Sequence, residues 1–123
     1  MKIKRFEEID SWNAARELTK TVYNFTIRES FSKDFGLKDQ IQRASVSIMS
    51  NIAEGFDSKT NKAFINFLNY SFRSASEVQS LLYVAFDQGY ITNSEFELAY
   101  KQCIEIKNLI GGFIRYLKKN PNY

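Results

Sequence analysis

The sequence predicts an all-α protein, an antiparallel up-down-up-down four-helix bundle that forms a single domain over residues 1–123. Few residues interrupt a helix, since the chain has one proline, at position 121, and five glycines. Apolar residues recur every three to four positions in four segments, and strand-like alternation is lacking. Short polar connections between these segments favour antiparallel neighbours.

The first helix is predicted over residues 11–28. Asp10 or Ser11 can cap it, because either side chain can accept a hydrogen bond from a free N–H of the first turn. Its apolar stripe recurs at helical spacing and consists of Trp12, Ala15, Leu18, Val22 and Phe25.

A loop is predicted over residues 29–36, with Phe31 and Phe35 folded back on the core. The second helix follows over 37–54, and Gly55 suits the left-handed position that ends a helix. Its main apolar stripe consists of Leu37, Ile41, Ala44, Ile48 and Ile52.

The third helix is predicted over residues 61–88 and is the longest. Its stripe keeps a spacing of three to four residues over three heptads and consists of Phe64, Phe67, Leu68, Ser71, Ser74, Ala75, Val78, Leu81, Leu82, Ala85 and Phe86. The small residues Ser71, Ser74 and Ala75 predict that a neighbouring helix comes close, and Gly89 ends the helix.

The fourth helix begins after Thr92, which is followed three residues later by Glu95 in a capping-box pattern. Its stripe consists of Phe96, Ala99, Cys103, Ile106, Ile110, Phe113 and Leu117. Gly111 and Gly112 each cost about 1 kcal/mol relative to alanine inside a helix, so this pair is interpreted as allowing close packing or a bend. The chain is expected to leave the helix near residues 118–120.

Three of the helices carry apolar residues outside these stripes. On the second helix they lie roughly 100–160° from the main stripe, and on the third they widen the apolar arc to about 200°. The nine residues are Val46, Met49, Ala53, Ile65, Phe72, Tyr83, Leu98, Leu109 and Tyr116. One small bundle cannot easily bury this surplus, so we predict that these residues form an oligomer interface. The alternative is that they are scattered surface residues.

The net charge is +3, from 17 basic and 14 acidic residues. This mild excess permits contact with nucleic acid without requiring it. The residues predicted for such a contact are Lys2, Lys4, Arg5, Arg16, Lys20 and Arg43. The alternative for the cluster near the N-terminus is ordinary solubility, since acidic residues dilute it.

A polar line runs between the two apolar sides of the second helix, formed by Arg43, Ser47, Ser50 and Glu54. It is interpreted as a polar groove or a pore lining in an assembly. The alternatives are a solvated helix face or an ion pair between subunits.

No catalytic, cofactor-binding or metal-binding residue is predicted, and the protein is not expected to be an enzyme. Histidine is absent, and the single cysteine, Cys103, lies on a core stripe, where a buried structural thiol is expected. A glycine-rich phosphate loop and a Glu-x-x-His motif are both lacking. Ser50 and Asn51 are interpreted as buried polar residues that fix the packing.

A cytoplasmic location is expected, with no membrane partner. No apolar run approaches the ~20 residues of a membrane span, and the N-terminus lacks the apolar core of a signal peptide.

Four motifs together resemble a known family. Phe-Glu-Glu at residues 6–8 precedes Trp12 and Ala-Arg-Glu-Leu at 15–18, and Gln-Ile-Gln-Arg-Ala at 40–44 continues into the most specific segment, 45–55. Residues 62–68 and 87–91 extend the match. With these motifs the chain resembles, over nearly its whole length, the four-helix-bundle family encoded within intervening sequences of bacterial 23S rRNA genes.

The resemblance implies a ring-like homopentamer with no established enzymatic activity. It also relates the fold to the accessory variability determinants of diversity-generating retroelements, which form a pentameric barrel that engages a reverse transcriptase and nucleic acid. Two departures stand out. Met49 replaces a frequent proline, so the second helix is expected to be straighter, and Gln42-Arg43 replaces a pair of basic residues.

The expected function is therefore a self-assembling interaction module, a homopentameric scaffold associated with nucleic acid, either RNA or DNA, with RNA favoured. The alternative is a scaffold that binds another protein and makes no nucleic-acid contact.

Overall fold

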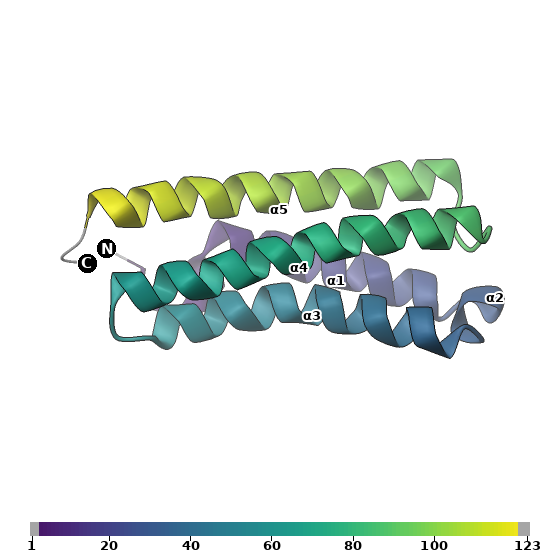
Figure 1. Cartoon of the computed structure of the whole chain (residues 1–123), viewed down its shortest axis with the longest axis horizontal. Coiled ribbons are helices and arrows are strands. Elements are labelled where there is room, and N and C mark those ends of the chain that lie inside the picture. Colours follow the sequence, from purple (N-terminus) through teal and green to yellow (C-terminus); the bar gives the residue numbers. More distant parts are fainter. Residues whose placement is uncertain (1–2, 121–123) are drawn as a thin grey trace.

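The computed structural model describes residues 3–120, and this part of the chain contains helices and no strand. The four long helices are α1 (Asp10–Thr26), α3 (Phe35–Asp57), α4 (Asn61–Asp87) and α5 (Asn93–Lys119). A 3-10 turn, η1 (Phe6–Glu8), precedes α1, and a short helix, α2 (Glu29–Ser32), follows it. The long helices lie antiparallel (Figure 1), which confirms the predicted fold class.

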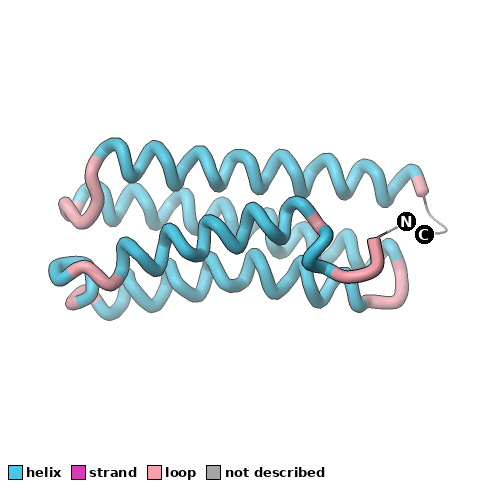
Figure 2. Tube along the Cα trace, turned by 180° about the vertical axis from the view of Figure 1, so that it is seen from behind, coloured by secondary structure: helices cyan, strands magenta, loops and turns pink. Residues whose placement is uncertain are grey.

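Each long helix packs mainly against two others, in the cyclic order α1, α3, α4, α5 and back to α1. The most extensive contact joins α3 and α4. In this arrangement the side of the bundle formed by α1 and α3 lies opposite the side formed by α4 and α5. The chain enters and leaves the bundle at the same end, as both ribbon views show (Figures 1 and 2).

The predicted stripes supply the core. On α3, the stripe that begins at Leu37 is buried along its whole length and faces the other helices. On α1, Trp12 is half-buried, while the other four stripe residues are buried. On α4, eight of the eleven predicted residues are buried, Phe67 and Ser74 are half-buried, and Phe86 is 38% exposed. Because the stripes meet at the centre, burial of this apolar surface holds the four helices together.

Small side chains bring α3 and α4 close together, as predicted. Ala75 is fully buried, and the Ser71 hydroxyl donates a hydrogen bond of 2.8 Å to the carbonyl oxygen of Ile48. The hydroxyls of Ser47 and Ser74 lie 2.9 Å apart across the same contact. These hydrogen bonds replace the bonds to water that the hydroxyls give up when the two helices pack together.

The predicted end of α3 is wrong. The helix continues to Asp57, and Gly55 is a buried residue within its last turns rather than a left-handed terminator. A Cβ atom at Gly55 would lie 2.7 Å from Cδ1 of Phe64 and 2.8 Å from Cβ of Phe67. Glycine is needed there because α4 passes too close for any side chain. Gly89, with φ of +76°, does follow α4 in the left-handed conformation.

The predicted cap of α1 is also wrong. Asp10 and Ser11 lie inside the helix, and the N-cap position belongs to Ile9, whose side chain cannot cap. The turn η1 packs onto α1, and its Ile9 N–H donates 2.9 Å to the Phe6 carbonyl oxygen. This extra turn shifts the helix start one residue earlier than the capping pattern suggested.

The predicted loop over residues 29–36 contains the helix α2 and the first residues of α3. Phe31 is fully buried and stacks on Tyr90 with ring centroids 4.9 Å apart, as expected for a residue folded onto the core. Phe35 is 73% exposed, which contradicts its predicted burial. Asp34 fixes the start of α3 by accepting a 3.2 Å hydrogen bond from the Leu37 N–H.

The capping box of α5 is confirmed. Thr92 accepts a 3.1 Å bond from the Glu95 N–H, and Glu95 accepts a 2.8 Å bond from the Thr92 N–H. The helix runs through Gly111 and Gly112, where an added Cβ would approach only the Arg115 guanidinium, at 3.6–3.7 Å. These two glycines therefore serve no close helix packing within the described chain.

Candidate interaction surfaces

The nine residues of the predicted oligomer interface all lie outside the buried core. Four are exposed and five half-buried, and the exposed ones are Val46, Tyr83, Leu98 and Tyr116. Met49, Ile65 and Phe72 pack partly against the core, and Ala53 and Leu109 are also half-buried. These side chains are therefore at least partly accessible on a single bundle, and their role as an interface stays a prediction.

These residues do not form one patch. Met49 faces α1, where its sulfur lies 3.3 Å from the Thr19 hydroxyl, and Val46 borders a hollow shared with Tyr23 of α1. On the opposite side of the bundle, Tyr83 packs on Phe96 of α5 with ring centroids 4.8 Å apart. Leu109 borders another hollow, between α5 and the start of α1.

The hollow on the α1–α3 side encloses about 480 Å³ and is lined by Tyr23, Asp39, Gln42, Arg43, Val46, Ser47 and Ser50. It contains three of the four residues of the predicted polar line, and Glu54 is not among its lining residues. Arg43 pairs with Asp39 at 2.8 Å on the same helix, and Ser50 donates to its own helix at the Val46 carbonyl oxygen. The polar line is thus largely satisfied within the chain.

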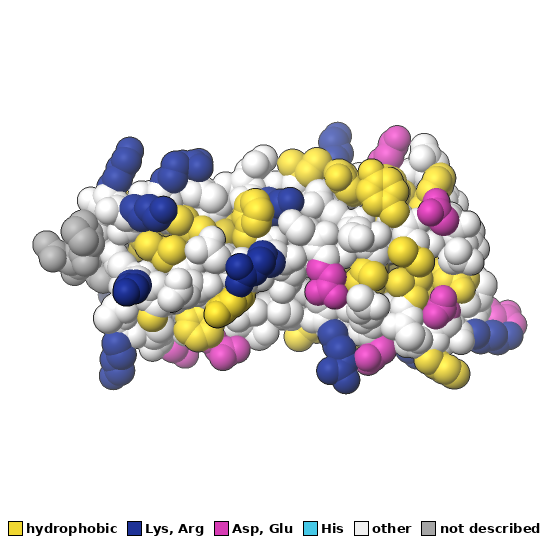
Figure 3. Space-filling view, viewed as in Figure 1, with side chains coloured by type: hydrophobic (Ala, Val, Ile, Leu, Met, Phe, Trp, Pro, Cys, Tyr) yellow, Lys and Arg dark blue, Asp and Glu magenta, His cyan; other side chains and the backbone are white. Residues whose placement is uncertain are grey.

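An aromatic cluster covers the other side of the bundle, where the end of α4 meets the start of α5. Phe96 lies 5.6 Å from Phe86 and 5.4 Å from Tyr100, centroid to centroid, and Tyr83 contacts both Phe96 and Tyr100. Tyr83 is 52% exposed. We call Tyr83, Phe86, Phe96 and Tyr100 the aromatic surface; apolar side chains gather over this part of the molecule in Figure 3.

Sequence reasoning assigned Phe86 and Phe96 to core stripes and did not select Tyr100. The available signal was the group of aromatic residues at positions 83, 86, 96 and 100, near the end of the third helix and the start of the fourth.

The predicted nucleic-acid residues that the structure describes are exposed but are not assembled into a free basic surface. Lys2 lies outside the described residues. Lys4 and Arg16 are exposed, and the Arg16 guanidinium lies 6.0 Å from the centre of the Trp12 ring. Each of the other three pairs with a carboxylate on its own helix or turn, in the pairs Arg5–Glu7, Lys20–Glu17 and Arg43–Asp39. These neighbours reduce the positive potential that a phosphate would meet.

A different basic surface lies where the start of α4 meets the end of α5. Residues 58–76 and 106–120 contain no Asp or Glu, and their basic residues are Lys59, Lys62, Arg73, Lys107, Arg115, Lys118 and Lys119. Asn61 of α4 joins the two stretches by donating 3.1 Å to the Leu117 carbonyl oxygen and 2.7 Å to that of Asn120. Figure 3 shows Lys and Arg side chains gathered at this end of the α4–α5 side. We call these seven residues the basic surface.

Polar contacts join the segments at the end of the bundle opposite the chain termini. Arg28, after α1, forms a two-fold contact with the Glu95 carboxylate, in which Nη1 donates 2.7 Å to Oε1. These bonds, together with that from the Thr92 N–H, lower the pKa of Glu95 to about 2. The Tyr90 hydroxyl donates 2.9 Å to the Asp34 carboxylate, which raises the pKa of Tyr90.

The cysteine and the polar residues considered for chemistry in the sequence have structural surroundings rather than those of a reactive site. Cys103 is buried, and burial raises the pKa of its thiol to about 12. Asn51 donates 2.9 Å to the Ser47 carbonyl oxygen and 3.0 Å to its hydroxyl. Residues 3–120 contain no group of three or more Cys, Asp or Glu side chains placed to hold a metal ion. Among the helices in this range, none has the length and apolarity needed to cross a membrane.

A family model described as 23S rRNA-intervening sequence protein matches residues 7–112. The chain belongs to this family. Among solved structures, one similar protein comes from Bacteroides thetaiotaomicron VPI-5482 and is described as a protein of unknown function from the S23 ribosomal protein family. Its sequence is 28% identical, and its TM-score is 0.78 over 85% of this chain and 97% of that chain. No curated protein matches the chain.

Proposed function

We propose that this member of the 23S rRNA-intervening sequence family is a non-enzymatic scaffold that assembles into a homopentameric ring and associates with RNA. The observation that carries the proposal is the presence of exposed apolar side chains on two opposite sides of the bundle. Val46 marks the α1–α3 side, and the aromatic surface marks the α4–α5 side. Single bundles rarely leave such surfaces open to water.

The two surfaces differ in shape and composition, which favours head-to-tail association. When two unlike patches pair, the growing assembly always has one unpaired patch at each of its two ends. Further subunits can therefore add until the two ends meet and a ring closes. The number five comes from the family resemblance, as does the similarity to the pentameric accessory variability determinants. A closed ring covers every copy of both surfaces, whereas a dimer would leave one copy of each exposed.

The association with RNA is supported by the basic surface. Its positive charge is repeated in every subunit of a ring, so the assembly presents a stronger field than one chain does. A second candidate is a scaffold that binds another protein without nucleic acid. It is favoured by Leu98, an apolar side chain that is 56% exposed and is not part of the aromatic surface.

Two measurements test this proposal. Native mass spectrometry at low micromolar concentration is expected to give a pentamer, and a persistent monomer would refute self-assembly. The native protein is also purified with and without nuclease treatment. We expect RNA to co-purify with the untreated sample and to be absent from the treated one. Protein partners that remain bound after nuclease treatment, with no RNA in either sample, would instead favour the second candidate.

A further inference from the structure

We infer that the basic surface is the nucleic-acid site and that it takes a single-stranded polynucleotide, whose phosphates contact the Lys and Arg side chains while a base stacks on Tyr70. This inference rests on the proposed association with RNA and assigns it to a site. The site differs from the residues near the N-terminus that the sequence pattern favoured.

The basic surface holds the chain's excess of positive charge. It contains seven of the 17 basic residues and none of the 14 acidic ones, which leaves ten basic residues against 14 acidic ones in the rest of the chain. The whole molecule is only mildly basic, but on the face shown in Figure 3 the two signs of charge gather toward opposite ends of the bundle. In Figure 3 most Lys and Arg side chains lie toward the end where the chain enters and leaves, and most carboxylates lie toward the other end. Phosphates are drawn to such a concentrated positive region.

The basic side chains of this surface are not neutralised by direct ion pairs within the described chain. None of the ion pairs formed within residues 3–120 includes any of its seven basic residues. Lys107 instead donates 3.0 Å to the neutral side-chain oxygen of Gln79, and its ammonium lies 4.8 Å from the centre of the Phe72 ring. The surface therefore differs from the predicted residues near the N-terminus, of which Arg5 and Lys20 pair with carboxylates.

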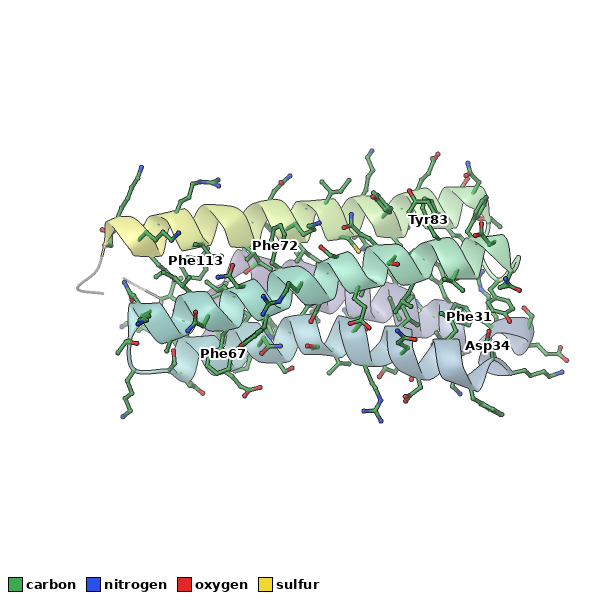
Figure 4. The ribbon with its side chains drawn as sticks, in the orientation of Figure 1. Phe31, Asp34, Phe67, Phe72, Tyr83 and Phe113 are labelled. Atoms are coloured by element: carbon green, nitrogen blue, oxygen red, sulfur yellow. The ribbon has the colours of Figure 1, made fainter. Side chains whose placement is uncertain are left out.

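An aromatic and amide-lined hollow adjoins the charges. It encloses about 210 Å³ and is lined by Asn66, Asn69, Tyr70, Phe72 and Arg73. Tyr70 is 50% exposed, and the Arg73 guanidinium lies 4.9 Å from the centre of its ring. In Figure 4 the neighbouring rings of Phe67 and Phe72 lie along opposite edges of α4, toward α3 and α5 respectively.

These groups favour an unpaired base over a duplex. Aromatic rings and guanidinium planes provide stacking platforms for bases that are free of a double helix. The amides of Asn66 and Asn69 offer both donors and acceptors to the edge of a base. A duplex keeps the faces of its bases stacked inside, so it would meet the charges without using Tyr70. An anionic membrane would likewise use only the charges.

Fluorescence anisotropy with a labelled 20-nucleotide oligouridine tests the assignment at low and moderate salt. The double variant Lys62→Glu/Arg73→Glu changes two exposed residues of the surface, and Arg16→Glu/Lys20→Glu is a control with the same change in net charge on α1. We expect the first variant to lose at least tenfold in affinity and to show a shallower salt dependence. We expect the control to lose less than threefold.

The variant Tyr70→Ala tests the stacking role. It retains every charge, so we expect about a tenfold loss for oligouridine and no change for a 20-base-pair duplex. Circular dichroism and native mass spectrometry of each variant verify that the helices and the assembly are intact. Anionic phosphatidylserine vesicles provide the comparison for a membrane surface.

Several results would overturn the assignment. Equal losses in both charge-reversal variants would mean that net charge alone drives binding, and a loss confined to the Arg16/Lys20 variant would place the site on α1. Equal binding of duplex and single strand, or preferential binding of vesicles, would refute the proposed ligand. An intact oligomer that binds no polynucleotide would refute both this site and the RNA association, whereas a monomer that binds would refute assembly alone.

Discussion

At Gly55 the missing side chain sets the distance between two helices. An alanine there would place Cβ 2.7 Å from the Phe64 ring and 2.8 Å from Phe67 Cβ, distances that require the backbones to separate. We expect Gly55→Ala to destabilise the fold by about 1–3 kcal/mol, because overpacking outweighs the gain of about 1 kcal/mol in helix propensity. Urea unfolding followed by circular dichroism measures this change.

Gly111→Ala is the matched control for this substitution. Its Cβ would approach nothing closer than the Arg115 guanidinium, at 3.6 Å, so helix propensity should dominate and raise stability by up to about 1 kcal/mol. A stabilised Gly55→Ala variant would contradict the close approach of α3 and α4. A destabilised Gly111→Ala oligomer would instead place a subunit contact at the glycine pair.

The Arg28–Glu95 pair gives the protein a defined sensitivity to acid. The pKa of Glu95 is about 2 in the folded chain, against an ordinary value of 4.5, so the carboxylate stabilises the fold above about pH 4.5. This contribution is lost as the pH falls from 4.5 to 2, because the unfolded chain takes up the proton first. Glu95→Gln retains the capping box but loses the charge that binds Arg28.

We therefore expect the thermal midpoint of the wild type to exceed that of Glu95→Gln at pH 7 and to converge with it near pH 2. The partial exposure of both side chains keeps the difference small, within the range of about 1 kcal/mol for accessible ion pairs. Thermal unfolding at a series of pH values measures it. A constant difference across this range would mean that Glu95 acts through hydrogen bonding alone.

At the scale of the elements, the long helices were predictable because their apolar residues keep one periodicity over many turns. The third helix was expected over 61–88 and is observed at Asn61–Asp87, and Thr92 and Glu95 form the expected capping box. The ends of the other helices depend on tertiary neighbours. A glycine such as Gly55 can end a helix, or it can let a second helix pack closely against the first. Only the position of Phe64 in the structure distinguishes these two roles.

Ala75 lies at the centre of the contact between α3 and α4, where it is fully buried. The hydroxyls of Ser71 and Ser74, on the same helix, form hydrogen bonds with Ile48 and Ser47 of α3. These bonds hold the two helices so close together that a phenylalanine ring at position 75 would not fit. We expect Ala75→Phe to lower the free energy of unfolding by about 1–3 kcal/mol or more. Differential scanning calorimetry measures the loss, and an unchanged midpoint would contradict the close packing.

At the scale of the whole molecule, the sequence indicated surplus apolar surface but not how it is arranged. The nine selected residues are at least partly accessible, yet they do not form one patch, because they lie on three helices and face different grooves between them. The sequence showed basic residues such as Arg73, Arg115, Lys118 and Lys119 but did not predict that they form one surface. Its two stretches, 58–76 and 106–120, are separated by 29 residues and meet only because α4 and α5 are antiparallel.

The two proposed subunit contacts can be broken separately. Val46→Asp places a carboxylate on the α1–α3 side, and Tyr83→Asp places one on the α4–α5 side, at positions where the native side chains are 41% and 52% exposed. An unpaired carboxylate buried between subunits costs several kcal/mol, so we expect either variant to be a folded monomer. Native mass spectrometry and circular dichroism measure both properties, and Ser30→Asp on α2 is the control expected to retain the oligomer.

A mixture of the two variants decides whether association is head-to-tail. Each variant keeps one intact surface: Val46→Asp keeps the aromatic surface, and Tyr83→Asp keeps the α1–α3 side. In a head-to-tail assembly these two intact surfaces are partners, so equimolar mixing is expected to give one-to-one heterodimers that cannot grow, because each remaining surface carries a carboxylate. If like surfaces paired instead, one variant would still form homodimers by itself and the mixture would contain no heterodimer. Native mass spectrometry with one variant labelled with ¹⁵N separates these species by mass.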